Sequence, residues 1–114
     1  MILGEAPGGN EARTGRVFSG PAGQLLDSAL ESAGIQRRDV YVSNVVKCRP
    51  EDNARPDRVN WEACHLYLER EVEVVRPTHA LLLGNSALQA VARKSGITKQ
   101  RGVRLMVKDP LWHG

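Results

Sequence analysis

The sequence has no long apolar run and no strong excess of one charge. No stretch of its 114 residues approaches the roughly 20 apolar residues that cross a bilayer. Its N-terminus also lacks the basic segment and apolar core of a secretory signal. We therefore expect a cytoplasmic protein without a membrane partner.

Cysteines and aromatic residues are also few. The two cysteines, Cys48 and Cys64, do not form a disulfide framework in a reducing compartment. The net charge of +3 is compatible with a polyanionic partner but does not require one. Because aromatic residues are scarce, the position of each is informative: Phe18, Tyr41, Trp61, Tyr67 and Trp112.

What is present is an ordinary globular composition. Hydrophobic residues make up 41% and charged residues 25% of the chain, which argues against disorder. A chain of 114 residues supports one core, so we expect residues 1–114 to form a single domain. Residues 1–3 resemble the end of a buried strand with no lead-in, so we expect either a fragment or a naturally minimal protein.

Segments with strand character alternate with segments of helical spacing. The strand-like segments are residues 1–3, 40–46, 78–84 and 103–107, and the third is apolar enough for a strand covered on both faces. The helix-like segments are residues 21–33, about 57–75 and about 85–94, the last capped by Asn85 or Ser86. This alternation predicts an α/β fold, a three-layer α/β/α sandwich around a central, mostly parallel four-stranded sheet.

Two long polar loops, residues 4–23 and 47–56, follow predicted strands. Ligands of open parallel sheets bind at the carboxyl ends of the strands, so we expect both loops to converge on one site. In the first loop, Glu5 places a carboxylate where it orients water or stabilises a developing cation, and Phe18 offers a ring that stacks on a flat ligand. The alternative is a surface loop with an incidental charge, anchored to the core by Phe18.

Five segments carry a resemblance to a known family. They are GEAPGGNEARTGRVFSGPAGQLLD from Gly4, YVSNVVKCRP from Tyr41, CHLYLERE from Cys64, LLLGNSAL from Leu81 and ITKQRG from Ile97. In this order they resemble the uracil-DNA glycosylases of family four, the bacterial, archaeal and phage type. The resemblance implies a hydrolase of base-excision DNA repair, which flips uracil out of DNA and breaks its N-glycosidic bond.

The resemblance also implies roles for individual residues. Glu5 matches the catalytic acidic residue that acts around the attacking water, and Phe18 matches the aromatic residue that stacks under uracil. Asn44 matches the asparagine that reads uracil, since one amide accepts from N3–H and donates to O4. The alternative for Asn44 is a strand-end residue that bonds its own backbone. The other implied uracil-binding positions supply pocket backbone or an acidic wall that excludes other bases: Ala6, Pro7 and Glu11.

Two family features are incomplete in this sequence. The family carries a four-iron–four-sulfur cluster on four cysteines, of which Cys48 and Cys64 resemble one pair, while the upstream Cys-x-x-Cys pair is not present. Because two thiolates do not complete this ligand set, we expect no cofactor in this chain, and the alternative for Cys64 is packing beside Trp61. The family also has a His-Pro motif near the end of its domain. His113 is followed by Gly114 and lies too close to Arg101, so we interpret it as preceding that motif.

Three functions stand as hypotheses. The first is an active DNA N-glycosylase whose partner is uracil-containing DNA. The second is a catalytically impaired, DNA-binding or replication-associated relative in a bacterial or phage-infected cell, with replication proteins as partners. The third, a nucleotide-binding domain, is least supported because no phosphate-binding glycine motif follows the first strand. We expect a monomer, interpret His65 and His79 as structural, and predict six DNA contacts: Lys47, Arg49, Asn53, Arg55, Lys99 and Arg101.

Overall fold

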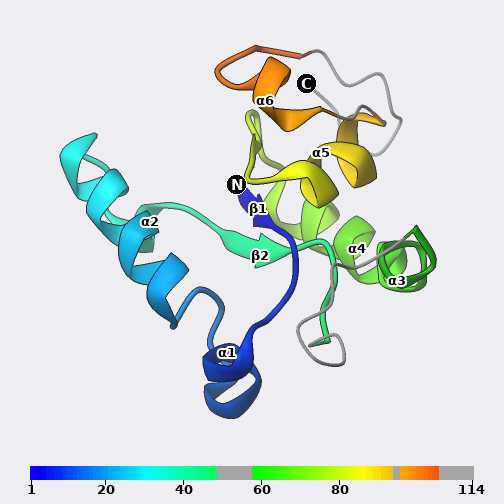
Figure 1. Ribbon diagram of the computed structural model, residues 1–114, viewed down its shortest axis with the longest axis horizontal. Coiled ribbons are helices and arrows are strands. Elements are labelled where there is room, and N and C mark those ends of the chain that lie inside the picture. Colours follow the sequence, from blue (N-terminus) through cyan, green and yellow to red (C-terminus); the bar gives the residue numbers. More distant parts are fainter. Residues whose placement is uncertain (49–57, 94–95, 106–114) are drawn as a thin grey trace.

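A parallel sheet forms the centre of the fold. The computed structural model describes residues 1–48, 58–93 and 96–105. Within them, the strand order is β2-β1-β3 and the central strand pairs in parallel with both neighbours (Figure 1). The strands are β1 (Ile2–Gly4), β2 (Val42–Asn44) and β3 (Leu81–Leu82). The predicted α/β fold with a parallel sheet is confirmed.

Successive side chains of β1 face two different cores. Ile2 packs with Leu26 and Leu30 of helix α2 (Pro21–Ser32). Leu3 packs on the opposite face, against α4 (His65–Val75) and α5 (Asn85–Ala92). Both residues are buried because helices cover both faces of β1, as Figure 1 shows. The helices therefore form the two outer layers that the sequence predicts.

The predicted fourth strand is not confirmed. Residues 103–105 belong to no strand, and Met106 and Val107 lie outside the described residues. Within the described part of the chain β3 pairs only with β1, and its Leu81 is 53% exposed. The strand predicted over residues 78–84 is thus shorter than expected, and its cover is partial, since Leu82 packs against one core and Leu83 against the other while Leu81 is exposed.

Helix α2 begins where the sequence predicts. Pro21 occupies its first turn, where a missing N–H costs nothing, and Gly34 follows its end in the left-handed conformation with φ 73°. Leu26 and Leu30 of the predicted apolar face are buried, but Leu25 is 72% exposed. Leu25 belongs to a different environment, because it borders the pocket described below.

A short helix interrupts the first predicted loop. Helix α1 (Gly9–Thr14) lies within residues 4–23 and has no buried residue, so no apolar periodicity indicates it in the sequence. Gly15 ends it at φ 72° with its N–H donating to the carbonyl of Glu11 at 2.8 Å. The prediction of a continuous loop is wrong here, since glycines on both sides allow one isolated helical segment.

The helix predicted over about residues 57–75 is broken in two. Helix α3 (Arg58–Ala63) and α4 are separated by Cys64, whose φ of −95° and ψ of 0° depart from helical values. Leu68 and Val72 of α4 are buried, as their spacing predicts. Helix α4 ends at Arg76, which adopts φ 48° ahead of Pro77.

The start of α5 differs from the predicted cap. Gly84, at φ 92°, precedes the helix, and no side chain caps it. The Oδ1 atom of Asn85 instead accepts a hydrogen bond from the N–H of Gly96 at 3.0 Å, which connects α5 to α6 (Ile97–Gln100). Ser86 turns toward the sheet and bonds a residue of the first loop. Among the described residues, no helix combines the length and the apolarity that crossing a membrane requires.

Candidate functional site

A pocket lies beyond the carboxyl ends of β1 and β2. Five of the predicted site residues line it: Glu5, Ala6, Glu11, Phe18 and Asn44. Helix α2 borders the pocket with its first residues, and Pro7 is not part of the lining. The first loop and the end of β2 therefore meet, as the sequence predicts, whereas residues 49–56 of the second loop lie outside the described residues.

Gly4 allows the Asn44 amide and the Phe18 ring to meet over β1. Gly4 pairs with Asn44 in the parallel register. A Cβ atom at Gly4 would lie 2.5 Å from Cζ of Phe18 and 2.7 Å from Oδ1 of Asn44, too close for either contact. The absence of a side chain at Gly4 is therefore what places an aromatic ring beside an amide in this pocket.

The amide of Asn44 borders the pocket without a hydrogen-bond partner among the described residues. Asn44 is only 4% exposed, and it follows Ser43 at the end of β2. Among the described residues its side chain has no hydrogen-bond partner, and neither amide atom is fully shut off from solvent. The alternative interpretation, an asparagine bonded to its own backbone, is therefore not what the structure contains.

The backbone around Phe18 is fixed by Arg37. Phe18 has φ 51°, which is uncommon for a residue with a side chain. Arg37, in the 3-10 turn η1 (Arg37–Asp39), donates to the carbonyls of Val17 and Phe18, the latter at 3.0 Å, and pairs with Asp27 at 2.9 Å. Gly23 of α2 lies directly against the Phe18 carbonyl, where a Cβ atom would clash. Sequence reasoning missed Arg37, because no local pattern connects it to Phe18.

Glu5 follows β1 and has a partner from the far end of the chain. The hydroxyl of Ser86 donates to Oε2 of Glu5 at 2.6 Å. The backbone carbonyl of Glu5 accepts from the N–H of Val46 at 3.0 Å, which extends the pairing of β1 with β2 past the strands themselves. Ser86 is 3% exposed, and sequence reasoning treats it only as a helix cap.

Glu11 connects α1 to the start of α2. Its Oε1 atom accepts a hydrogen bond from the N–H of Gly20 at 3.2 Å. A Cβ atom at Gly8 would lie 3.1 Å from its Oε2 atom, so Gly8 also leaves room for this carboxylate. Glu11 thus holds the pocket wall together, whichever ligand the pocket takes.

Comparison with known proteins agrees with this arrangement. The family model described as "Uracil DNA glycosylase superfamily" matches residues 1–112. The chain belongs to the uracil DNA glycosylase superfamily. Relatives of this chain include uracil-DNA glycosylases and a phage DNA polymerase.

Two relatives are named "Type-4 uracil-DNA glycosylase". The protein of Pyrobaculum aerophilum is 45% identical over 96 residues, which cover 84% of this chain and 49% of the relative. The protein of Thermotoga maritima is 43% identical over 104 residues, covering 90% and 54%. A "DNA polymerase" of Bacillus phage SP01 is 32% identical over 103 residues, covering 90% of this chain and 11% of the polymerase. The chain thus spans about half the length of the glycosylases that it matches.

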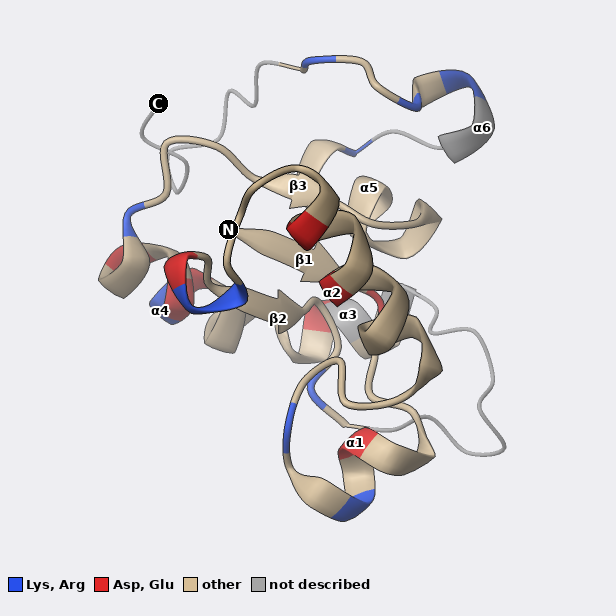
Figure 2. Ribbon diagram, turned by 90° about the vertical axis from the view of Figure 1, so that its left-hand side faces the viewer, with Lys and Arg blue, Asp and Glu red and all other residues tan. Residues whose placement is uncertain are grey.

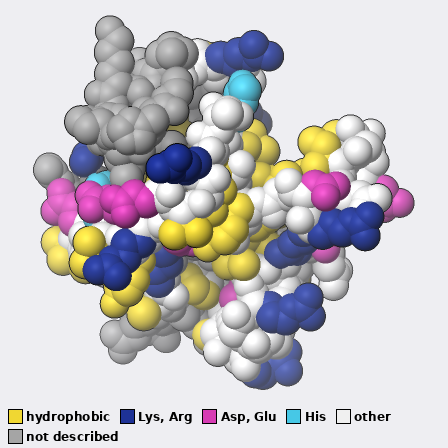
Figure 3. Space-filling model, turned by 180° about the vertical axis from the view of Figure 1, so that it is seen from behind, with side chains coloured by type: hydrophobic (Ala, Val, Ile, Leu, Met, Phe, Trp, Pro, Cys, Tyr) yellow, Lys and Arg dark blue, Asp and Glu magenta, His cyan; other side chains and the backbone are white. Residues whose placement is uncertain are grey.

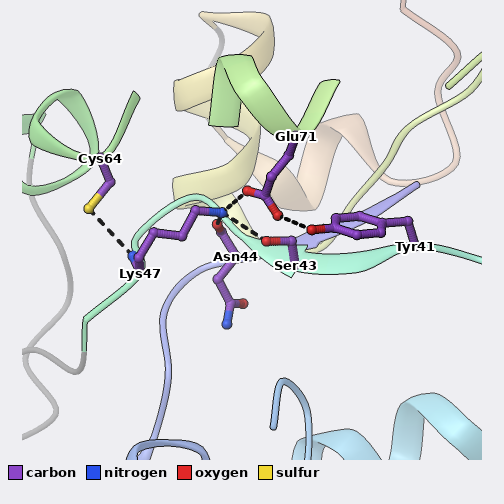
Figure 4. A network of polar contacts seen from close by, with 6 residues as sticks. All are labelled: Tyr41, Ser43, Asn44, Lys47, Cys64 and Glu71. Carbon is purple, nitrogen blue, oxygen red and sulfur yellow. Dashed lines mark hydrogen bonds and ion pairs between the residues drawn. The ribbon is translucent and has the colours of Figure 1, made fainter. Parts of the chain in front are cut away.

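On the side of β2 that faces away from the pocket, the polar side chains bond one another. Lys47 donates to Oγ of Ser43 at 2.8 Å and to the carbonyl of Asn44 at 2.7 Å, and it pairs with Glu71 of α4. The hydroxyl of Tyr41 donates to Oε2 of the same carboxylate at 2.6 Å. Figure 4 shows this network, with the side chain of Asn44 pointing away from it.

This network shifts two pKa values. Its hydrogen bond to Glu71, together with burial and the negative charge there, raises the pKa of Tyr41 to about 12. Burial acts to raise the pKa of Glu71, but hydrogen bonds from Lys47, Tyr41 and Ser43 outweigh it and hold that pKa below its usual value. The raised pKa keeps Tyr41 protonated and the lowered pKa keeps Glu71 ionised, so that the phenol donates to the carboxylate.

The predicted DNA contacts are not brought together. The ammonium of Lys47 faces inward to Glu71, so we do not retain it as a phosphate contact. Lys99 and Arg101 are exposed near α6, at the end of the molecule opposite α1, so the expectation that they lie at the pocket edge is wrong (Figures 1 and 2). Arg49, Asn53 and Arg55 lie outside the described residues. On the face in Figure 3, basic side chains are spread among acidic and apolar ones.

The two cysteines lie in the second loop, at Cys48, and between α3 and α4, at Cys64. Cys48 is exposed, and Cys64 is half-buried with its Sγ atom accepting from the N–H of Lys47 at 3.5 Å. In the described ranges, no three histidine, cysteine or acidic side chains gather where a metal ion would bind. Two thiols alone do not fit a four-iron–four-sulfur cluster, which needs four ligands, and we derive no chemistry from such a group.

The described histidines lie outside the pocket lining. His65 pairs with Glu69 one helical turn along α4, at 3.2 Å. His79 accepts a hydrogen bond from the N-terminal amine with its carbonyl at 3.1 Å, and its ring contacts Thr78. The contacts of His65 are within one helix, and those of His79 join the start of the chain to residues 78 and 79; His113 lies outside the described residues.

Proposed function

We propose that this chain forms the uracil-binding part of a uracil-DNA glycosylase, a base-excision repair hydrolase that breaks the N-glycosidic bond of uracil flipped out of DNA. The observation that carries the proposal is the meeting of Glu5, Phe18 and Asn44 in one pocket at the ends of β1 and β2. The type-4 relatives support it, since their names state this activity. The partner is DNA that contains uracil, and the chain acts as a monomer.

Asn44 selects uracil over other bases. Its amide oxygen accepts from uracil N3–H and its amide nitrogen donates to O4, a pattern that cytosine reverses. Because Asn44 as a residue is 4% exposed and its amide has no partner among the described residues, a wrong base that covers the pocket leaves the amide unpaired. An unpaired buried group is costly, which is how such a site discriminates.

Phe18 and the neighbouring backbone hold the base, and Glu5 acts on the sugar side. The ring of Phe18 stacks on the face of uracil, while the backbone of Ala6 forms the adjacent wall and Pro7, outside the lining, follows it. The carboxylate of Glu5 orients water and stabilises the positive charge that develops on the sugar as the bond breaks. Glu11 excludes other bases from the pocket wall. Arg49, Asn53 and Arg55 remain the proposed phosphate contacts.

A gel assay tests this function. The chain is incubated in excess with single-stranded and double-stranded oligonucleotides that contain one uracil, and with matched oligonucleotides that contain cytosine. We expect abasic product from the uracil substrates only. If no abasic product forms at high enzyme excess, the glycosylase proposal is overturned.

A second function is favoured by the phage relative. A protein named "DNA polymerase" matches over 90% of this chain, which fits a replication-associated, DNA-binding relative that lacks catalysis. Such a protein binds DNA through phosphate contacts and forms no abasic product. Its affinity would fall steeply between 50 and 200 mM salt, because phosphate contacts release counterions. Binding that does not change with salt contradicts this alternative.

A further inference from the structure

The contact between Ser86 and Glu5 joins two distant parts of the chain. The hydroxyl oxygen of Ser86 lies 2.6 Å from Oε2 of Glu5, a length typical of a hydroxyl that donates to a carboxylate. Ser86 is 3% exposed, while Glu5 is half-buried and lines the pocket. A short hydrogen bond in such a place restricts the orientation of the carboxylate.

The fold holds Ser86 rigidly. Gly84 turns the chain at φ 92° into α5, and Ser86 lies in the first turn of that helix. The following residues, Ala87 and Leu88, are buried, and Ala87 packs in the same core as Leu3 of β1. Since Glu5 follows β1 directly, the donor and the acceptor are carried by two elements that are packed against each other.

Ser86 does not serve as a helix cap. Gly84 occupies the cap position of α5, and no side chain caps that end. The adjacent polar residue, Asn85, is turned away to the N–H of Gly96. The hydroxyl of Ser86 is therefore directed to Glu5 alone among the described residues.

One oxygen of Glu5 is held and the other is left for the pocket. Oε2 accepts from Ser86, whereas Oε1 has no hydrogen-bond partner among the described residues. A glutamate without such a contact distributes its carboxylate over several rotamers. With it, the carboxylate keeps one orientation in the pocket that Glu5 lines, which is the preorganisation that electrostatic stabilisation requires.

We propose that Ser86 is a positioning residue for Glu5, which directs the carboxylate toward the positive charge that develops on the deoxyribose. The proposal rests on the proposed function, because it deepens the role of Glu5 in that reaction. Ser86 does not line the pocket and does not touch the substrate. It acts only through the carboxylate that it holds.

The experiment compares two abasic-site analogues in duplex DNA. One contains a pyrrolidine ring, which carries a positive charge where the sugar cation forms, and the other contains the neutral tetrahydrofuran ring. Fluorescence anisotropy gives the dissociation constant of each for the wild type, S86A, S86T, E5Q and the E5Q/S86A double variant. The ratio of the two constants measures the preference for the cation, independently of turnover.

We expect the wild type to bind the cationic analogue more tightly than the neutral one. In S86A the ratio of the two dissociation constants should change by about tenfold, because one hydrogen bond to a charged group is lost. Affinity for the neutral analogue stays unchanged. S86T, which keeps the hydroxyl, retains the preference. In the E5Q background the S86A substitution has no further effect, because the residue acts through Glu5.

The results distinguish the role of Ser86 from the proposed function. If S86A keeps the full preference of the wild type, or lowers the preference equally in the E5Q background, the role of Ser86 is overturned and the proposed function stands. If the wild type binds neither analogue, both are overturned. Thermal unfolding shows whether each variant is folded. If S86T does not fold, the comparison of E5Q with the E5Q/S86A double variant still decides the role of Ser86.

Discussion

The two faces of β2 use polar side chains in opposite ways. Tyr41 and Ser43 face α4, where Lys47 and Glu71 complete a closed set of hydrogen bonds and one ion pair (Figure 4). Asn44, the next residue after Ser43, faces the pocket, and its amide has no partner among the described residues. The alternation of a strand produces this difference within two residues.

The difference separates polar groups that stabilise the fold from one that is available to a ligand. The amide of Asn44 has no partner among the described residues, so a ligand supplies its hydrogen bonds without breaking any that hold the fold. On the other face, the side chains of Tyr41, Ser43, Lys47 and Glu71 all have partners. We therefore expect substitutions on the pocket face to change binding and those on the α4 face to change stability.

The largest effect is expected for N44A. Removal of the amide takes away both hydrogen bonds to uracil, and we expect the rate of abasic-product formation to fall by about 10²–10³. Thermal unfolding should change little, because the amide has no partner among the described residues to lose. The matched control is S43A on the other face, which should retain activity. An N44A variant that keeps the wild-type rate would contradict the proposed role of Asn44 in binding uracil.

The next largest effect is expected for K47M. This substitution leaves Glu71 without its cation. In the wild-type pair, the side chain of Lys47 is 24% exposed and that of Glu71 is 17% exposed. A fully buried pair would lose 3–5 kcal/mol, and partial exposure reduces the expected loss in the free energy of unfolding to about 2 kcal/mol. Urea unfolding measures it, with K99M as the exposed control. Unchanged stability in K47M would show that the network is not structural.

A smaller effect is expected for E71Q, and it depends on pH. The pKa of Tyr41 is raised from 10.0 to about 12, so its contribution to stability is present below pH 10 and is lost as the pH rises through 12. The pKa of Glu71 is lowered from 4.5, so its contribution is present above that pH and is lost as the pH falls through the folded value.

E71Q removes the carboxylate that causes the Tyr41 shift. An NMR titration of the Tyr41 ring should therefore show its pKa moving from about 12 toward 10.0. Urea unfolding across the same pH range should lose its dependence at both ends. A Tyr41 pKa that stays near 12 in E71Q would contradict the assigned cause.

Much of the fold is predictable because local patterns carry it. The helical spacing of Leu26 and Leu30 and the start at Pro21 predict α2, and the apolar residues 1–3 predict the end of a buried strand. Helix α1 is not predictable, because it buries no side chain and has no periodic signal. The break at Cys64 is hidden for the opposite reason, since the apolar spacing continues on both sides of it.

The site is predictable only where residues follow strand ends. Glu5 and Phe18 lie in the segment that leaves β1, Asn44 is the last residue of β2, and the topology brings them together. Ser86 and Arg37 are not predictable, because their partners lie 81 and 19 residues away in the sequence and only packing brings them close. Their polar side chains resemble an ordinary cap and an ordinary surface charge.

The most direct test of the central claim is an NMR titration of the Asn44 side-chain amide. The labelled chain is titrated with a single-stranded oligonucleotide that contains one uracil, and with the same oligonucleotide that contains cytosine instead. If Asn44 reads uracil, its amide signals shift with the uracil oligonucleotide alone, while the signals of Tyr41 on the other face of β2 stay in place. Equal shifts with both oligonucleotides, or none with either, would contradict the account.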